Sequence, residues 1–118
     1  MRTRDQERAE FAYKKIREVK NNNNYKSLVR GFPTMILQNG LGQALAFLKA
    51  KGEIHHLSLY NHINEWLGDH ENNAFDILKE IISRDSFIYR LYTKETLLLL
   101  IWLKKFAEAE IEDNSKKE

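Results

Sequence analysis

Residues 89–111, YRLYTKETLLLLIWLKKFAEAEI, contain the longest apolar run of the chain, and this stretch decides the fold. Its centre, residues 97–103, is seven consecutive apolar residues. A membrane-spanning helix needs about 20 such residues, so the run is too short to cross a bilayer. A helix that is apolar on all sides is typical of the interior of a bundle. We therefore predict a central helix, capped by Thr93 and ending near Glu112, around which the other helices pack.

A second apolar segment, residues 33–51, reads PTMILQNGLGQALAFLKAK and predicts two shorter helical pieces that pack against the first segment. Gly40 and Gly52 are expected to end these pieces, because glycine readily adopts the left-handed conformation that follows a helix. Upstream, Pro33 is expected to break or sharply kink the chain, because proline disfavours helical geometry in the preceding residue. The expected core stripe of the second piece is Leu41, Ala44, Leu45 and Leu48.

The other segments also have helical spacing. Residues 3–20 are predicted to form a helix capped by Thr3, and the four asparagines at 21–24 a loop in which Asn24 caps the next helix. Residues 58–67 are predicted to form an amphipathic helix. Asn73 is expected to cap the next helix, which is followed by a short segment that ends near Tyr92. The expected core stripe of the first helix is Ala9, Ala12, Tyr13, Ile16 and Val19. That of residues 58–67 is Leu59, Tyr60, Ile63, Trp66 and Leu67. That of the helix capped by Asn73 is Ala74, Ile77, Leu78, Ile81 and Ile82.

These elements predict an all-α fold, a compact bundle of six to seven helices around the central C-terminal helix. A chain of 118 residues has room for one domain, with frayed ends at residues 1–2 and 113–118. The chain has no cysteine, which excludes disulfides and thiolate metal sites. Residues 1–5 are charged and give no secretory signal, so we expect a cytoplasmic protein without a membrane partner.

The basic residues are unevenly distributed. Residues 1–30 hold nine Lys or Arg and four Asp or Glu, and residues 31–107 hold eight of each. Residues 108–118 hold two Lys and five acidic residues. A basic surplus on one element favours an anionic partner, although a solvated surface gives the same pattern.

No catalytic constellation is evident. Two histidines on one helical face need a spacing of three or four, but His56 and His62 are six apart, so we predict no metal site and no cofactor. His62 and Glu65 share a face, and a small hydrolase that uses this pair is one alternative function. Trp66 and Trp102 lie on apolar stripes and are expected in the core.

Two other aromatic residues, Phe11 and Tyr25, fit no stripe and are candidates for surface contacts. A small DNA-binding helical regulator is a second alternative. It would need polar base-reading residues on its second helix, and residues 43–47, QALAF, are too apolar for a groove. Another helical assembly or adaptor protein is a third.

Several motifs together resemble a known family. They are Arg4, Gln6, Ala9 and Ala12, Pro33, the Asn39-Gly40-Leu41 turn, the block at residues 43–47, the run Tyr89-Arg90-Leu91-x-Thr93-x-Glu95, and the run Trp102-Leu103-Lys104-Lys105-Phe106-Ala107. With them the chain resembles the small helical subunit of the Cmr complex, the type III-B CRISPR effector. The resemblance covers nearly the whole chain and is weakest over residues 52–83.

The resemblance implies an all-helical, non-catalytic subunit of an antiviral complex. Several copies would stack beside the guide-bearing backbone subunits and line the channel that holds guide RNA and target RNA, while other subunits perform cleavage. The implied partners are other Cmr subunits, both RNAs and neighbouring copies. The charge map suggests these RNA-binding positions: Arg4, Arg8, Lys14, Lys15, Arg17, Lys49, Lys51, Arg90, Lys104 and Lys105.

Overall fold

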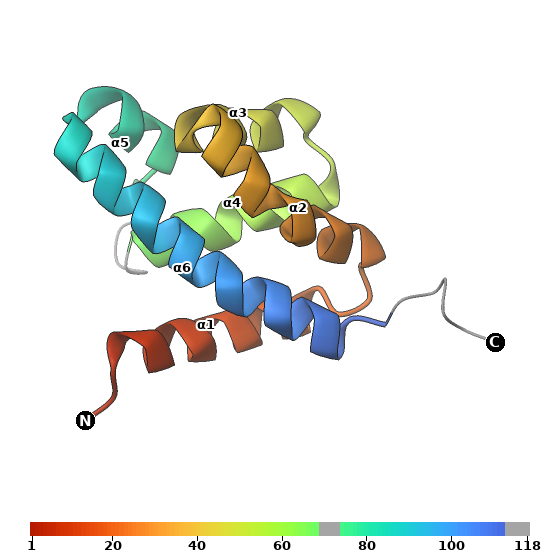
Figure 1. Cartoon of the computed structure of the whole chain (residues 1–118). Helices are drawn as coiled ribbons and strands as arrows, with labels where there is room; N and C mark the ends of the chain where they lie inside the picture. The colour runs from red at the N-terminus through yellow and green to blue at the C-terminus, as the bar shows by residue number, and fades with distance from the viewer. Residues whose placement is uncertain (69–73, 113–118) are drawn as a thin grey trace.

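A computed structural model describes residues 1–68 and 74–112, and within these ranges the chain forms helices and no strands. The all-α prediction is confirmed, with six helices along the described chain (Figure 1). In order they are α1 (Arg4–Glu18), α2 (Asn23–Asn39), α3 (Leu41–Lys51), α4 (Ile54–Leu67), α5 (Ile77–Ser83) and α6 (Ser86–Glu110). None of the described helices is long and apolar enough to cross a membrane.

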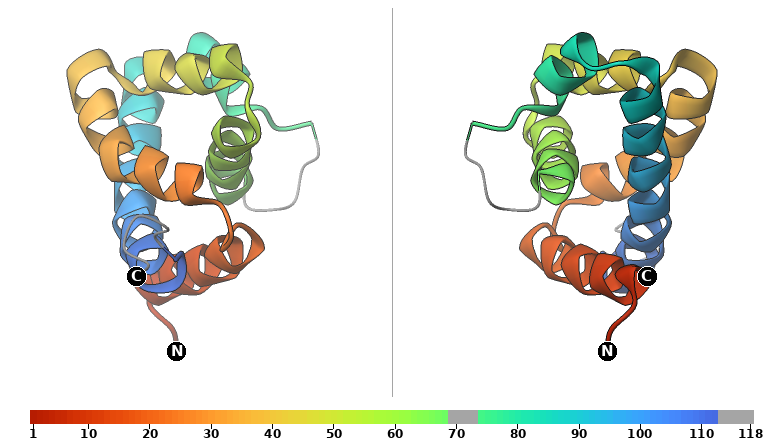
Figure 2. Two further views of the ribbon diagram at one scale, coloured as in Figure 1. Left: turned by 90° about the vertical axis from the view of Figure 1, so that its right-hand side faces the viewer. Right: turned by 90° about the vertical axis from the view of Figure 1, so that its left-hand side faces the viewer.

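Helix α6 is the longest element and contacts α1, α2 and α4. Helix α1 lies at one end of the molecule and α3 and α5 at the other, as the two side views in Figure 2 show. Only one side of α6 is covered, however, since Ile101 in the middle of the apolar run is 55% exposed. The expectation that the run would be buried on all sides is therefore wrong. The buried face of α6 consists of Thr96, Leu99, Leu100, Leu103 and Ala107.

The start of α6 also differs from the prediction. The helix begins at Ser86, and the Asp85 side chain caps it by accepting a hydrogen bond from the Ile88 N–H at 3.1 Å. Thr93 is not a cap, because its Oγ1 donates to the Tyr89 carbonyl at 3.0 Å inside the helix. The predicted short segment and the last helix are thus one helix of 25 residues.

Helix α2 continues through Pro33, so of the predicted break or kink the break does not occur. Phe32 is fully buried beside the proline, and Val29 and Ile36 are buried on either side of it. Burying each of these side chains contributes about 1.5–3 kcal/mol, which together outweighs the cost of about 3 kcal/mol for proline inside a helix. The N-cap is Asn22, whose side chain accepts from the Tyr25 N–H at 3.1 Å, and not Asn24.

The two predicted glycine stops are confirmed. Gly40 ends α2 with φ of +87° and Gly52 ends α3 with φ of +69°, in the region that favours glycine. The stripe Leu41, Ala44, Leu45 and Leu48 is fully buried.

Helix α4 begins at Ile54, four residues before the predicted start, and ends at Leu67 as expected. Leu59, Tyr60, Ile63 and Trp66 are buried as predicted. In α5 only Ile77 of the predicted stripe is buried, and Ile82 is 82% exposed. The expected cap Asn73 lies outside the described residues, and the N-cap of α5 is Asp76.

Helix α1 begins as predicted, with Thr3 and Gln6 forming a reciprocal capping box. Its buried face is rotated, because Arg8 and Phe11 point inward while Tyr13 is 39% exposed. The prediction placed Arg8 among the RNA-binding residues, whereas the structure pairs it with Glu95 of α6. Phe11 is 7% exposed and Tyr25 is fully buried, so neither is the surface contact that the sequence suggested.

Candidate nucleic-acid interface

The ten predicted RNA-binding residues lie on three helices. They divide into three groups, on α1, at the C-terminal end of α3 and on α6: Arg4, Arg8, Lys14, Lys15 and Arg17; Lys49 and Lys51; and Arg90, Lys104 and Lys105. The groups differ in how far other side chains already neutralise or hold each charge. This difference separates structural cations from those available to a ligand.

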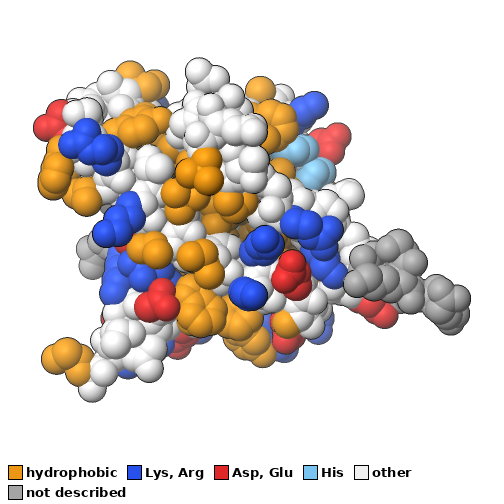
Figure 3. All heavy atoms as spheres, in the orientation of Figure 1, with side chains coloured by type: hydrophobic (Ala, Val, Ile, Leu, Met, Phe, Trp, Pro, Cys, Tyr) orange, Lys and Arg blue, Asp and Glu red, His pale blue; other side chains and the backbone are white. Residues whose placement is uncertain are grey.

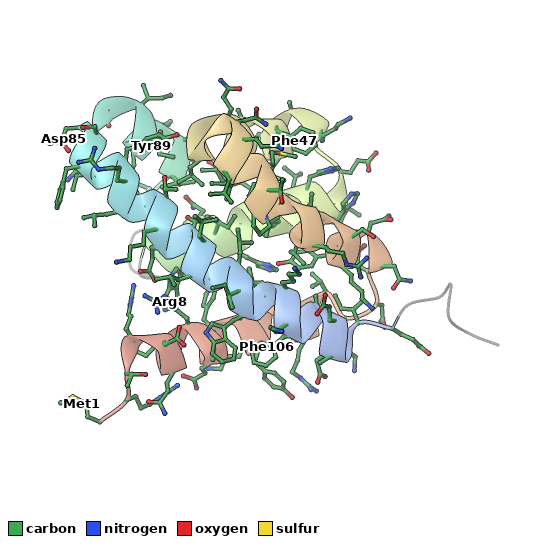
Figure 4. All side chains as sticks on the ribbon, in the orientation of Figure 1. Met1, Arg8, Phe47, Asp85, Tyr89 and Phe106 are labelled. Atoms are coloured by element: carbon green, nitrogen blue, oxygen red, sulfur yellow. The ribbon has the colours of Figure 1, made fainter. Side chains whose placement is uncertain are left out.

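Arg8 is a structural cation. Its Nε and Nη2 donate to the two carboxylate oxygens of Glu95 at 2.6 and 3.0 Å, and its Nη1 donates to Asp5 at 3.0 Å. The side chain lies between α1 and α6 (Figure 4), and the residue is only 8% exposed. The hydrogen bonds to Glu95 raise the pKa of Arg8 further. Arg8 is therefore not available to an RNA phosphate, which corrects its prediction as an RNA-binding residue.

Glu95 is the common hydrogen-bond acceptor of side chains from α1 and α4. Trp66 Nε1 also donates to its Oε1, at 2.9 Å. Burial alone would raise the pKa of Glu95, but the hydrogen bonds from Arg8 and Trp66 outweigh burial and lower it. Glu95 is consequently a charged carboxylate, held by donors from α1 and α4.

Arg4 and Lys15 flank the same region. The Arg4 guanidinium lies 4.4 Å from the centre of a Trp66 ring, and its Nε is 3.7 Å from Glu95. Lys15 Nζ is 2.9 Å from a Glu65 oxygen and 3.5 Å from Glu18. Both cations therefore already have carboxylate partners.

The remaining predicted positions on α1 and α3 are more open but also have partners. Lys14, 69% exposed, is 3.6 Å from Glu10, and Arg17 donates to the Tyr13 hydroxyl at 3.2 Å. Lys49 lies 5.0 Å from the ring centre of Tyr60, and Lys51 lies 5.8 Å from that of Phe47. These are exposed contacts of modest strength, which a stronger anionic ligand could replace.

The outer face of α6 has a different character. We define it as Arg90, Lys94, Leu97, Leu98, Ile101, Lys104 and Lys105. The spacing of these residues puts them on the side of the helix opposite its buried face. Among the described residues, no carboxylate lies within 4 Å of Arg90, Lys94, Lys104 or Lys105. Arg90 to Lys105 spans about 22 Å at 1.5 Å per residue.

Apolar side chains fill the middle of this face. A shallow groove is lined by Tyr89, Thr93, Leu97, Leu98 and Ile101, together with Arg90 and Lys94. Because α6 crosses the front of the molecule, Figure 3 displays this face, with hydrophobic side chains at the centre and Lys and Arg on both sides. The arrangement combines cations that can hold phosphates with an apolar surface that can contact a neighbour.

Lys94 was not among the predicted positions. It lies one helical turn beyond Arg90 and two before Ile101, so its spacing alone would have placed it on this face. The prediction missed it because it started the last helix at Thr93 and separated Arg90 from the residues that follow.

The hydrolase alternative depended on an accessible His62. The structure places His62 in the interior, 5% exposed, with its Nδ1 joined to the Tyr25 hydroxyl by a 2.7 Å hydrogen bond. Burial, with a contribution from Lys15, lowers the pKa of His62 to about 4. Glu65 instead pairs with Lys15. A buried base of this pKa is a poor general base near neutral pH.

Comparison with known proteins gives a consistent result. The family model described as CRISPR-associated protein (Cas_Cmr5) matches residues 4–110. The "CRISPR system Cmr subunit Cmr5" of Thermus thermophilus is 33% identical over 116 residues, which cover 96% of this chain and all of that protein. The crystal structure of a CRISPR-associated Cmr5 family protein from the same organism has a TM-score of 0.82 and 33% identity, covering 95% of this chain and 100% of that one.

Proposed function

This chain belongs to the Cmr5 family and is thus a small subunit of the type III-B CRISPR effector, and we propose that it acts there as a non-catalytic RNA-channel subunit. In this proposal several copies stack in the cytoplasmic complex and line the channel that holds guide RNA and target RNA. The observation that carries the proposal is the outer face of α6, where four cations have no carboxylate partner among the described residues.

The recognition that we propose is electrostatic. Lys and Arg side chains hold phosphate oxygens without reading bases, and guide–target pairing supplies the sequence specificity of such complexes. Unpaired cations lose little when they bind a phosphate, because they give up no existing ion pair. We therefore assign the principal phosphate contacts to Arg90, Lys94, Lys104 and Lys105.

The other predicted positions have a secondary role in this proposal. Arg4 and Lys15 would have to share or exchange a carboxylate partner before holding a phosphate. Lys14, Arg17, Lys49 and Lys51 are exposed at weaker contacts and could add to the field along the channel. Arg8 is excluded because it is buried.

A non-catalytic role is supported by the environment of the titratable groups. The base that the sequence offered, His62, is buried, and the carboxylate Glu95 is occupied by Arg8 and Trp66. The DNA-binding alternative loses support because Ala44 and Leu45, in the expected recognition segment, are fully buried. The alternative is an adaptor that makes no RNA contact, and the following experiment distinguishes it from an RNA-channel subunit.

The test is a fourfold variant, Arg90→Ala, Lys94→Ala, Lys104→Ala and Lys105→Ala, in assembled complex with target RNA. Each phosphate contact contributes about 0.7–0.9 to the slope of log affinity against log salt, so we expect the slope to shrink by about 3 for each copy whose four cations bind phosphates. The readout is RNA affinity by filter binding at several salt concentrations, and complex composition by size-exclusion chromatography.

The matched control is the pair Lys14→Ala and Arg17→Ala, which removes two exposed cations from α1. We expect it to change the salt slope much less. If the fourfold variant assembles normally and keeps both affinity and slope, the outer face of α6 does not contact RNA, and the subunit is an adaptor.

A further inference from the structure

The turn between α3 and α4 brings three possible metal ligands together. Gly52 ends α3 with a left-handed backbone, Glu53 is the extended residue before α4, and His55 and His56 lie in its first turn. One carboxylate oxygen of Glu53 and one ring nitrogen of each histidine all lie within 4.8 Å of one another. Across residues 1–68 and 74–112, no second group of three or more such ligands meets this criterion.

His56 is buried in this turn, and one of its two ring nitrogens has no hydrogen-bond partner. The residue is 8% exposed, and its Nδ1 has no hydrogen-bond partner. The ring packs edge-on against Phe47, at 5.6 Å between ring centres, and lies 4.1 Å from the ring of His55. Leaving a buried polar atom unsatisfied costs about 1–3 kcal/mol, so a native structure usually has a reason to keep one.

We propose that Glu53, His55 and His56 form a binding site for a divalent transition metal of the zinc type. A triangle of donors no wider than 4.8 Å has a point within about 2.8 Å of all three, and Zn²⁺ ligands lie at about 2.0–2.2 Å. Each donor therefore moves by less than about 1 Å to reach the metal. Glu53 is exposed and can make this adjustment without disturbing the core.

The donor set indicates the class of metal. Two imidazoles and one carboxylate suit Zn²⁺, Ni²⁺ or Cu²⁺, whereas Mg²⁺ and Ca²⁺ require oxygen ligands. The fourth coordination position is left to water or to a group from another molecule.

Two features limit the affinity. Lys51 carries a positive charge beside the Phe47 ring that packs against His56, and the N-terminal end of α4 carries a partial positive charge as well. Both positive charges repel a metal cation, so replacing Lys51 by a neutral residue is expected to increase the affinity for the metal. The prediction that the chain has no metal site rested on the spacing of histidines within one helix. It missed this group because Glu53 lies outside the helix.

The test is titration of the full chain with zinc chloride, followed by calorimetry and by NMR of the histidine ring protons. We expect one Zn²⁺ per chain, with shifts confined to His55 and His56, and a higher melting temperature in its presence. Glu53→Gln removes an exposed ligand and is expected to weaken binding by at least about tenfold, as is His56→Ala.

Two variants separate this site from others. His70→Ala, which removes a histidine elsewhere in the chain, should leave zinc affinity unchanged, while Lys51→Gln should increase it. Magnesium chloride should produce no histidine shifts. Absence of zinc binding by the wild-type chain, or binding that Glu53→Gln and His56→Ala leave intact, would overturn the proposal.

Discussion

Helix α1 and helix α6 both display several basic residues, but most of those on α1 have carboxylate partners, whereas the four on the outer face of α6 have none among the described residues. On α1, Arg8 pairs with Glu95 and Lys15 pairs with Glu65, and both acids come from other helices. On α6, Lys104 and Lys105 have no such partner among the described residues. Counted along the sequence, the surplus of basic residues lies in the first 30 residues. In the folded chain, acidic residues from other helices neutralise much of this surplus.

The largest expected effect tests the paired side of this comparison. Arg8→Ala should lower the free energy of unfolding by about 3 kcal/mol, because it leaves the partly buried carboxylate of Glu95 without its main partner. Urea denaturation followed by circular dichroism measures this loss.

The matched control for Arg8 is Arg17→Ala on the same helix. Arg17 forms a hydrogen bond and a cation–π contact with the exposed Tyr13 side chain and has no ion pair among the described residues, so its removal should change stability by less than about 0.5 kcal/mol. If the two variants lose similar amounts, Arg8 is not the structural cation that its burial indicates.

The second prediction concerns pH and the buried side of α4. His62 has a pKa of about 4 in the folded chain and about 6.5 unfolded, so between these values the unfolded chain binds the extra proton. Stability should therefore fall as the pH drops through this window, by about 2 kcal/mol between pH 7 and pH 5. Urea denaturation at both pH values measures the change.

The variant His62→Gln tests the origin of this pH dependence. It removes the titrating group, so most of the change between pH 7 and pH 5 should disappear. His56, whose pKa burial also lowers, contributes in the same direction and accounts for a smaller remainder. An unchanged pH dependence in His62→Gln would show that another group is responsible.

The third prediction lies at the boundary between the two faces of α6. Trp102 is partly buried, stacks on Phe106 at 5.5 Å, and donates from Nε1 to Asp5 at 3.0 Å. The sequence placed it in the centre of the core, where Trp102→Ala would cost about 3–5 kcal/mol. Because Trp102 is only partly buried, we expect a loss of about 1.5 kcal/mol in Trp102→Ala, measured by urea denaturation.

Trp102→Phe refines this test, since it keeps the ring and removes the indole donor. It should lose less than Trp102→Ala. A loss of about 3 kcal/mol or more in the alanine variant would instead show that the ring is a full core residue, as the sequence indicated.

How far the sequence predicts the fold depends on which local signals agree. Thr3 and the glycines at 40 and 52 mark helix ends through local chemistry, and all three were confirmed. Pro33 and Thr93 gave equally strong local signals, but tertiary burial overrode the first and Asp85 provided an earlier start for the second. Local rules therefore identified the helices but not every boundary.

The candidate site was less predictable, for a physical reason. Whether a lysine or arginine is available depends on which acids lie nearby in space, and Glu95 is 87 residues from Arg8 along the chain. Periodicity could have found Lys94, since it is a property of one helix. The pairing of α1 with acids on α4 and α6 could not be found in this way.

The smallest expected effect tests the open side of the comparison. Lys105 is exposed on the outer face of α6 and has no carboxylate within 4 Å among the described residues. Lys105→Ala should therefore change the free energy of unfolding by less than about 0.5 kcal/mol, because alanine keeps the helix and no ion pair is lost. Lys105→Glu, measured in the same urea experiment, reverses the charge one turn before Glu108 and Ala109. If it also stays within about 1 kcal/mol, the charge on this face contributes little to folding. A loss of about 2 kcal/mol or more in Lys105→Ala would mean that this lysine is held within the fold, and the contrast between α1 and α6 would then fail.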